Sequence, residues 1–312
     1  PTMTVAEVID AIRAAEELGY RYCLLADEGF MPDVYVTLGA AARQTSRIRL
    51  GPVTNSYTRH PAVTASAAAT LHQLSGGRAL VCLVAGGSMV LEPMGIPRES
   101  PLTVVREAME IMRHLWSGEP VTWQGQRFRL RGARISMGRQ EIPIWLAVRG
   151  DRLLELAGQQ ADGVVVMVKA DLGPALEFVE QGSARTGNRP RRIYLDRMAY
   201  TPEMLDHARV LYMYSVMDSP PRLLKALGLT DAEIAALRAA IAEGGTSAAT
   251  HLVTGDMIRN YQIAGTPAEC SQTLRTLIRN HRLDTFLLNI ISPSLETNIR
   301  LMHEVASIVA QA

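Results

Sequence analysis

The sequence predicts an α/β fold of the (β/α)₈ TIM-barrel type. Short segments that are apolar on both faces alternate with helical segments along most of the 312 residues, and such strands are typical of a parallel sheet covered on both sides. The helices between them supply the crossovers that parallel pairing needs. With 47% apolar residues the chain can bury the core of a single barrel domain over residues 1–312.

The pattern predicts seven strands and seven helices. The strands are expected at Tyr22–Ala26, Ile48–Val53, Ala79–Ala85, Ile144–Val148, Gly163–Val168, Arg192–Leu195 and Thr285–Ile290. The helices are expected at Val5–Leu18, Asp33–Gln44, Pro61–Leu74, Pro101–Trp116, Asp151–Gln159, Asp171–Arg185 and Ala268–Asn280. The first helix opens with a capping box from Thr4 to Glu7. A closed barrel would begin with a strand before this helix, so we expect the first strand to be missing from the sequence as given.

Two segments interrupt the alternation. Leu115–Ile142 reads as a β-hairpin that turns at Gln124-Gly125. Residues Asp196 to Ala264, between strands seven and eight of the expected barrel, are too many for a plain loop and predict helices near Pro202–Met217 and Thr230–Glu243. Insertions after barrel strands lie on the catalytic face, so this helical insertion is expected to line or cover the substrate pocket.

The segment from Arg49 to Gly87 carries the clearest indication of function. It contains a buried strand, a polar turn, a small-residue helix and a second strand that ends in glycines. Function in such βαβ units collects where the strands end. Polar side chains follow the first strand and bare backbone follows the second, which suits a flat heterocycle with polar edges: Thr54, Asn55, Ser56, Tyr57, then Gly86, Gly87 and Ser88.

The same segment resembles the luciferase-like monooxygenase superfamily, and within it the branch that uses the deazaflavin coenzyme F420, as in methylene-tetrahydromethanopterin reductase. The resemblance rests on four stretches: Gly51-Pro52-Val53-Thr54-Asn55, Thr58-Arg59-His60-Pro61, Thr64-Ala65-Ser66 and Leu74-Ser75-Gly76-Gly77-Arg78-Ala79. Weaker similarity extends from about Ala11 to Leu288. The resemblance implies an oxidoreductase that transfers a hydride between coenzyme F420 and a C=O, C=N or C=C group of a small organic substrate.

The resemblance also points to catalytic residues after the strand Tyr22–Ala26. Asp27 and Glu28 follow that strand. The family usually has Asp-His here, so Glu28 is a departure. A carboxyl group beside a cofactor can donate or accept a proton, although acids at this position can also simply cap the following turn.

The turn after the strand Ile48–Val53 is expected to lie behind the cofactor ring. The family often has a non-prolyl cis peptide there, and the corresponding bond joins Pro52 to Val53. Thr54 and Asn55 would bind the pyrimidine edge or face the substrate, and we count Asn55 as a catalytic candidate. Ordinary turn chemistry is the alternative for both.

Two glycine turns are the expected cofactor contacts. Gly86, Gly87 and Ser88 form one of them. The other is at Gly150, which precedes the predicted helix Asp151–Gln159. Exposed N–H groups at a helix start bind anions, and the family places the cofactor phosphate there. Asp151 opposes an anion, so Arg149 or Arg152 should compensate for its charge. The remaining residues assigned to the cofactor are Arg149, Gly150, Asp151, Arg152 and Met167.

Composition limits the other possibilities. A net charge of +1 gives no indication of nucleic acid, and no apolar run is long enough for a membrane span. We expect a cytoplasmic homodimer with a small-molecule substrate. Cys23 and Cys82 lie in apolar strands and read, with Cys270, as free thiols. The histidines, His60 included, show no metal-ligand spacing.

Three other functions remain open. One is an FMN-dependent monooxygenase of the same superfamily, with oxygen and reduced flavin as co-substrates. Another is a catalytically silent barrel that only binds a cofactor, for which the Glu28 departure is the one indication. A Schiff-base aldolase acting through Lys169 is the most distant, since no acid–base pair flanks that lysine.

Overall fold

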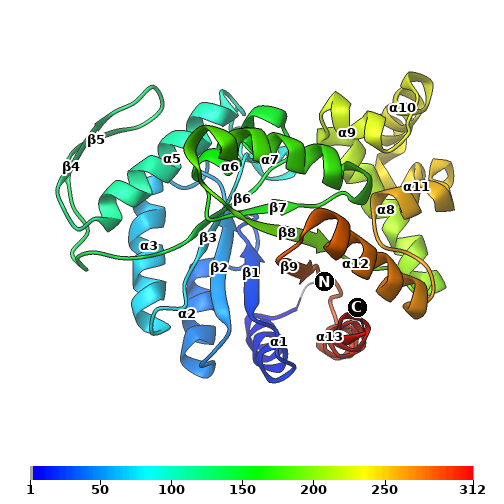
Figure 1. Ribbon diagram of the computed structural model, residues 1–312, viewed down its shortest axis with the longest axis horizontal. Helices are drawn as coiled ribbons and strands as arrows, with labels where there is room; N and C mark the ends of the chain where they lie inside the picture. Colours follow the sequence, from blue (N-terminus) through cyan, green and yellow to red (C-terminus); the bar gives the residue numbers. More distant parts are fainter. Residues whose placement is uncertain (1–2, 312) are drawn as a thin grey trace. The chain divides into compact units, whose positions relative to one another are not determined.

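The computed structural model describes residues 3–311, without the side chains of residues 214–218 and 246–248 (Figure 1). Two compact units can be distinguished within the chain. Unit 1 comprises Pro1–Val148, Gln160–Val164 and Ile291–Met302. Unit 2 comprises Arg149–Gln159, Val165–Ile290 and His303–Ala312. The prediction of a single domain is not tested by this division and remains a prediction.

Seven strands form one sheet, in the order β1-β2-β3-β6-β7-β8-β9. The pairs β1–β2, β2–β3, β3–β6 and β8–β9 are all parallel. This order and direction confirm the predicted α/β barrel-type fold. The bounds are β1 Tyr22–Ala26, β2 Arg49–Thr54, β3 Val81–Val84, β6 Ile144–Ala147, β7 Gly163–Val166, β8 Arg191–Asp196 and β9 Thr285–Leu288.

Four of the strands, β3, β6, β7 and β9, are shorter than predicted, β6 by one residue and the others by two or three. Ala79 makes only an isolated bridge to Leu50, so regular pairing of β3 begins at Val81. β7 ends at Val166 because the chain turns into the short 3₁₀ helix η1 (Lys169–Asp171), and Val168 packs among the helices of the insertion. Met167 and Lys169 therefore follow β7 rather than belong to it.

The predicted helices are present, and their ends lie within one residue of the predicted ones. They are α1 Val5–Glu17, α2 Val34–Gln44, α3 Pro61–Leu74, α5 Pro101–Trp116, α6 Asp151–Gln160, α7 Leu172–Thr186 and α12 Pro267–His281. The capping box of Thr4 and Glu7 is formed at the start of α1. The sequence reasoning missed several further elements: α4 Ser88–Leu91, α9 Pro221–Ala226, η2 Thr250–Leu252, α11 Gly255–Tyr261 and α13 Leu295–Ala310.

In unit 1, helices α1, α2 and α3 lie beside the strands β1, β2 and β3 (Figure 1), and α1 contacts α2, α2 contacts α3 and α3 contacts α5. The predicted hairpin is formed by β4 (Val121–Gln124) and β5 (Arg129–Ala133), which pair antiparallel. A buried carboxylate fixes its tip: Glu107 in α5 accepts from the backbone N–H groups of Gln126, Arg127 and Phe128 at 2.7–3.1 Å.

Arg78, in the turn before β3, is a second fixed point of unit 1. Its guanidinium makes five hydrogen bonds of 2.6–3.1 Å, to the Ser75, Ile48, Ala42 and Thr45 carbonyls and to the Thr45 hydroxyl. Only a planar group with five N–H donors can satisfy such a set. The Leu74–Ala79 stretch of the family resemblance is thus accounted for by chain packing between α2, β2 and β3.

In unit 2, the predicted insertion is helical. Helices α8 (Pro202–Asp218) and α10 (Asp231–Ala248) correspond to the two predicted ones, and Thr230 caps α10 in a capping box with Glu233. Buried apolar side chains of α8, α9, α10 and α11 form one cluster that includes Val168, two residues after β7. The η1 turn contacts α9 and α11. The insertion therefore packs on the segment at the carboxyl end of β7.

Two glycines allow α6 and α7 to approach closely within unit 2. A Cβ on Gly158 would collide with the Val179 carbonyl oxygen, and a Cβ on Gly182 would collide with the Glu155 carbonyl oxygen. The backbones of the two helices are therefore in direct contact, which fixes the position of α6 against α7.

The remaining sequence predictions concern thiols and membrane spans. Cys23, Cys82 and Cys270 are free thiols, and burial raises the pKa of Cys82 to about 12. Within residues 3–311, no helix has the length and apolarity required to cross a membrane.

Candidate functional site

Asp27, directly after β1, lies at the centre of a charged cluster in unit 1. Its Oδ2 accepts from the Thr54 hydroxyl at 2.9 Å and from Arg59 Nε at 3.3 Å. Arg59 also donates to Asp33 at 2.9 Å and lies over the ring of Tyr35. Both partners of Asp27 donate, so its carboxylate acts as an acceptor that joins the ends of β1 and β2. This geometry favours a positioning role for Asp27 over proton donation.

Glu28 differs sharply from its neighbour. Its side chain is exposed, and its carboxylate makes no hydrogen bond or ion pair with the part of the chain that the structure describes. Only its backbone carbonyl is engaged, accepting from Phe30 N–H at 2.7 Å. The alternative in which Glu28 caps the following turn with its side chain finds no support, and the carboxylate remains available for a ligand.

Thr54 and Asn55 are both buried at the end of β2. The Asn55 Oδ1 accepts from the backbone N–H groups of Tyr57 and Thr58 at 2.9 and 3.0 Å, which is an Asx turn. The Thr54 hydroxyl is committed to Asp27. The side-chain oxygens of Thr54 and Asn55 therefore stabilise the turn, which is the alternative to ligand binding given in the sequence analysis.

The expectation of a cis peptide at Pro52–Val53 was wrong, because the described residues contain no cis peptide bond. The reason lies in the pairing of β2. Pro52 and Val53 stay in register with Leu25 and Ala26 of β1, and the Val53 carbonyl accepts from Asp27 N–H at 2.8 Å. This pairing continues a regular extended strand, in which the trans bond is the low-energy form. Val53 is half-buried, whereas Pro52 is buried.

The glycine turn after β3 is only partly open to a ligand. Gly86 is buried and has a φ of 77°, and a Cβ there would meet Leu91 at 2.8 Å and Tyr57 at 3.1 Å. A glycine is therefore required at position 86 by the turn conformation and by the packing of Leu91 and Tyr57. Gly87 is half-buried and has no heavy atom within 4 Å of the Cβ position, so its backbone can be approached closely. Ser88, also half-buried, begins α4.

In unit 2, the start of α6 has the open backbone that was predicted for a phosphate site. No heavy atom lies within 4 Å of a Cβ built on Gly150. The Gly150 carbonyl accepts from Leu153 and Leu154 N–H at 2.9 Å, which begins the helix. The open Cβ position of Gly150 leaves room beside the helix start, where the helix dipole favours an anion.

The charge of Asp151 is compensated by a residue that the sequence reasoning missed. We expected Arg149 or Arg152 to balance it, but the partner is Arg222 of α9, whose Nε lies 2.6 Å from Asp151 Oδ1. Arg222 also donates to the Arg149 carbonyl at 2.8 Å and forms an ion pair with Asp171. Arg149 instead donates to the Ser219 hydroxyl at 3.3 Å, and Arg152 is exposed.

Among the acids of this network, Asp171 has the most strongly shifted pKa. Burial raises its pKa to about 6, while the adjacent Arg222 acts in the opposite direction. Its side chain is 3% exposed and that of Arg222 is 19% exposed. Arg222 comes from the insertion, about seventy residues after Asp151 in sequence. The only sequence signal that could have indicated its role was its place in a basic–apolar helix after Pro220-Pro221.

The remaining candidates are peripheral. Met167 is half-buried between β7 and η1. His60 caps α3, since its Nδ1 accepts from Ala62 N–H at 3.2 Å. Across residues 3–311, no group of three His, Cys, Asp or Glu side chains could hold a metal ion.

Comparison with known proteins shows the family. The model of the luciferase-like monooxygenase family matches residues 1–284. The chain is 32% identical to a 5,10-methylenetetrahydromethanopterin reductase of Archaeoglobus fulgidus over 317 residues, 97% of this chain and 95% of that protein. Among solved structures, the coenzyme F420 dependent tetrahydromethanopterin reductase from Methanopyrus kandleri matches with a TM-score of 0.88 and 26% identity, over 99% and 96% of the two chains.

A further solved structure supports the fold alone. An F420-dependent secondary alcohol dehydrogenase in complex with an F420-acetone adduct matches with a TM-score of 0.77 and 20% identity, over 99% of this chain and 96% of that one. The parallel strand order, the family model over residues 1–284 and the full-length relatives agree, and the chain belongs to the luciferase-like monooxygenase family.

Proposed function

We propose that this protein is a coenzyme F420-dependent oxidoreductase that transfers a hydride between the cofactor and a C=O, C=N or C=C group of a small organic substrate. The observation that carries the proposal is full-length similarity to a 5,10-methylenetetrahydromethanopterin reductase, together with the structural match to a coenzyme F420 dependent reductase. When bound, the deazaflavin supplies the hydride chemistry, and the chain supplies binding, orientation and proton transfer.

In unit 1, the candidates for the ring of the cofactor fall into two groups. Val53, Gly87 and Ser88 are half-buried, and Gly87 has accessible backbone. Pro52, Thr54, Asn55 and Gly86 are buried and support these positions from behind. An open Cβ position at Gly87 fits a flat ring that approaches the main chain, as a side chain there would occupy the same space.

In unit 2, we propose that the cofactor phosphate binds at the start of α6. The open Cβ position of Gly150 fits an anion bound by backbone N–H groups. Arg222 neutralises the Asp151 carboxylate that would otherwise repel the phosphate. Arg149, Arg152 and Met167 are the further candidates on this side.

The proton that accompanies a hydride is assigned to Glu28. When a hydride reaches the carbon of a C=O or C=N group, the oxygen or nitrogen gains a proton, and in the reverse direction it loses one. Glu28 is an exposed carboxylate without a partner among the described residues, at the end of a barrel strand, so it can serve either direction. Asp27 is fixed by Thr54 and Arg59 and serves to position this loop.

The predicted setting of the enzyme also belongs to this proposal. We propose a cytoplasmic homodimer without a nucleic-acid or membrane partner, in keeping with a net charge of +1. The helical insertion is proposed to confer substrate specificity, because it packs on the segment after β7.

Oxygen dependence separates this function from that of an FMN-dependent monooxygenase. The purified protein would be supplied with reduced coenzyme F420 and a panel of ketones, imines and enones, with and without oxygen, while oxidation of the deazaflavin is followed by absorbance. We expect substrate-dependent oxidation at the same rate without oxygen. Turnover that requires oxygen and reduced FMN would contradict the proposal, and binding of coenzyme F420 without turnover of any of these classes would favour the silent barrel.

A further inference from the structure

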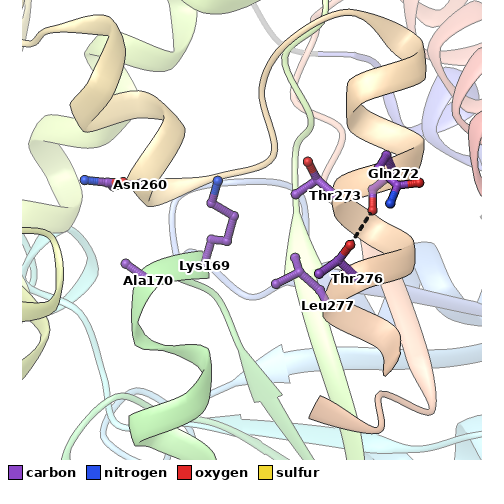
Figure 2. Close-up of a pocket in the computed structure, with 7 residues that line it drawn as sticks. All are labelled: Lys169, Ala170, Asn260, Gln272, Thr273, Thr276 and Leu277. Carbon is purple, nitrogen blue, oxygen red and sulfur yellow. Dashed lines mark hydrogen bonds between the residues drawn. The ribbon is translucent and has the colours of Figure 1, made fainter. Parts of the chain in front are cut away.

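Unit 2 contains a cavity of about 350 Å³ that the cofactor assignment leaves unused (Figure 2). It lies between η1, α11 and α12. Its lining combines one cation, two amides, two hydroxyls and two apolar side chains: Lys169, Asn260, Gln272, Thr273, Thr276, Ala170 and Leu277. This volume is at the lower end of the range for small-molecule sites. Lys169 and Thr273 are half-buried in its lining, whereas Asn260, Gln272 and Thr276 are exposed.

Lys169 is the unusual member of this lining. Its side chain is half-buried and extends from η1 between the helix of Asn260 and the helix of Gln272 and Thr273 (Figure 2). The ammonium group makes no hydrogen bond or ion pair with any residue that the structure describes. A cation that has lost part of its water without gaining a partner carries a free-energy cost that an anion could offset.

The charged groups around Lys169 do not supply that anion. Burial lowers the pKa of Lys169, and Asp196 in β8 acts in the opposite direction, as does Cys270 in α12, while Arg259 in α11 adds to the lowering. The Asp196 carboxylate is buried and already accepts from Met198 N–H at 2.7 Å, Ile263 N–H at 3.0 Å and the Tyr194 hydroxyl. It stabilises its own strand end and does not contact the ammonium group.

Three of the other polar side chains of the cavity are available as donors. The side chains of Asn260, Gln272 and Thr273 make no hydrogen bonds within the described part of the chain. Thr276 donates its hydroxyl proton to the Gln272 carbonyl at 2.9 Å, so it can only accept (Figure 2). An ammonium group with two amides and one free hydroxyl is a donor set suited to anionic oxygen.

We propose that this cavity binds the carboxylate or phosphate group of a small molecule, with Lys169 as the ion-pair partner and Asn260, Gln272 and Thr273 as hydrogen-bond donors. The cavity lies immediately after β7 and beside the last helix of the insertion, where the barrel fold places ligands. The proposal does not depend on which cofactor the protein uses. The anionic group belongs to the substrate or to the cofactor tail, and the test separates the two.

The sequence offers a direct test, because Lys169 and Lys225 are its only lysines. Lys225 is exposed in α9 and serves as an internal control. An amine-acylating reagent would be applied to the whole protein, and the acylation of each lysine would be followed by peptide mass spectrometry. The additions would be inorganic phosphate or succinate, with neutral succinamide and chloride of matched ionic strength as controls.

We expect saturating phosphate or succinate to slow acylation of Lys169 at least fivefold and to leave Lys225 unchanged, with no effect of succinamide. Gln272→Ala and Thr273→Ala should each weaken this protection, while Lys225→Gln should not. If Lys169 and Lys225 respond alike, or if Lys169 is not protected by either anion, the proposal is wrong and the lysine only extends its ammonium group into water.

Coenzyme F420 is the second arm of the same experiment. Protection of Lys169 by the deazaflavin alone would assign the subsite to the cofactor tail. Protection by phosphate or succinate that persists with the deazaflavin bound would assign it to the substrate. Isothermal titration of Lys169→Gln with succinate gives a readout independent of acylation, and binding equal to that of the unmodified protein would overturn the assignment of Lys169.

Discussion

The Arg222 guanidinium in helix α9 donates from Nε to Asp151 Oδ1 at 2.6 Å and from Nη2 to the Arg149 carbonyl at 2.8 Å. Both neighbours of Gly150 are therefore held by one cation from the insertion. The third partner of Arg222 is the buried carboxylate of Asp171, at the start of α7. The insertion thus determines the position of the helix start to which we assign the cofactor phosphate.

Removing Arg222 is expected to destabilise the protein in a pH-dependent way. Burial raises the pKa of Asp171 from 3.8 to about 6 and Arg222 opposes this, so Arg222→Met should raise that pKa further. Above its unfolded pKa of 3.8 an acid with a raised folded pKa costs stability, and this cost grows until the pH reaches the folded pKa, about 6 for Asp171 and higher without Arg222. We expect a loss of about 3 kcal/mol in the free energy of unfolding at pH 8 and a smaller loss at pH 5, where Asp171 is largely protonated.

Urea unfolding at the two pH values measures this difference, with the exposed Arg152→Met as a matched control that should change stability little at either pH. An equal loss at pH 5 and pH 8 would mean that Arg222 acts through packing alone.

Gly150 is expected to distinguish phosphate binding from general damage. The Cβ position is open, so Gly150→Asn and Gly150→Asp should both fold. The aspartate adds a negative charge beside the anion and should weaken binding of the phosphorylated cofactor at least tenfold more than the neutral asparagine does. Titration with a dephosphorylated analogue is the control. If the two variants lose affinity equally for both ligands, the phosphate binds elsewhere, and the Gly87 turn is the next candidate.

Glu28 is expected to take part in proton transfer. Glu28→Gln keeps the size of the side chain and removes its acid, and turnover should fall roughly 10²–10⁴-fold with little change in cofactor affinity. Glu119→Gln, at another exposed acid, is the control and should leave turnover unaltered. Steady-state rates and cofactor titrations are measured on both variants. Normal turnover of Glu28→Gln across the pH range would remove Glu28 from the mechanism.

Arg78 is expected to matter for stability and not for the cofactor. Lysine has three donors on a flexible stem and cannot reproduce the five hydrogen bonds of Arg78, so Arg78→Lys should lower the free energy of unfolding by about 2–4 kcal/mol. Cofactor affinity, measured well below the melting temperature, should be unchanged. A large loss of affinity in a folded Arg78→Lys protein would show that the Leu74–Ala79 segment takes part in the site.

Much of the fold could be predicted because local patterns determine it. Apolar runs covered on both faces gave the seven strands, and capping boxes such as Thr4 with Glu7 and Thr230 with Glu233 gave helix starts. The bounds of β3 and β7 were misplaced, because Ala79 makes only an isolated bridge to Leu50 and Val168 packs among the helices of the insertion instead of pairing. Apolar character alone does not separate those two environments.

The candidate site was less predictable because its contacts join residues distant in sequence. The open backbone at Gly150 followed from a glycine before a helix, which is a local feature. The engagement of Thr54 by Asp27 and of Asp151 by Arg222 depends on how separate elements meet, 27 and 71 residues apart. The regular pairing of Pro52 and Val53 with β1 likewise overrode the family expectation of a cis bond.

The identity of the cofactor is the central claim, and competing equilibrium titrations test it most directly. Coenzyme F420 and FMN would be titrated side by side into the same preparation and followed by fluorescence quenching. We expect tighter binding of the deazaflavin, with Gly150→Asp weakening it in the same assay. Tenfold tighter binding of FMN, a difference of about 1.4 kcal/mol, would contradict the account.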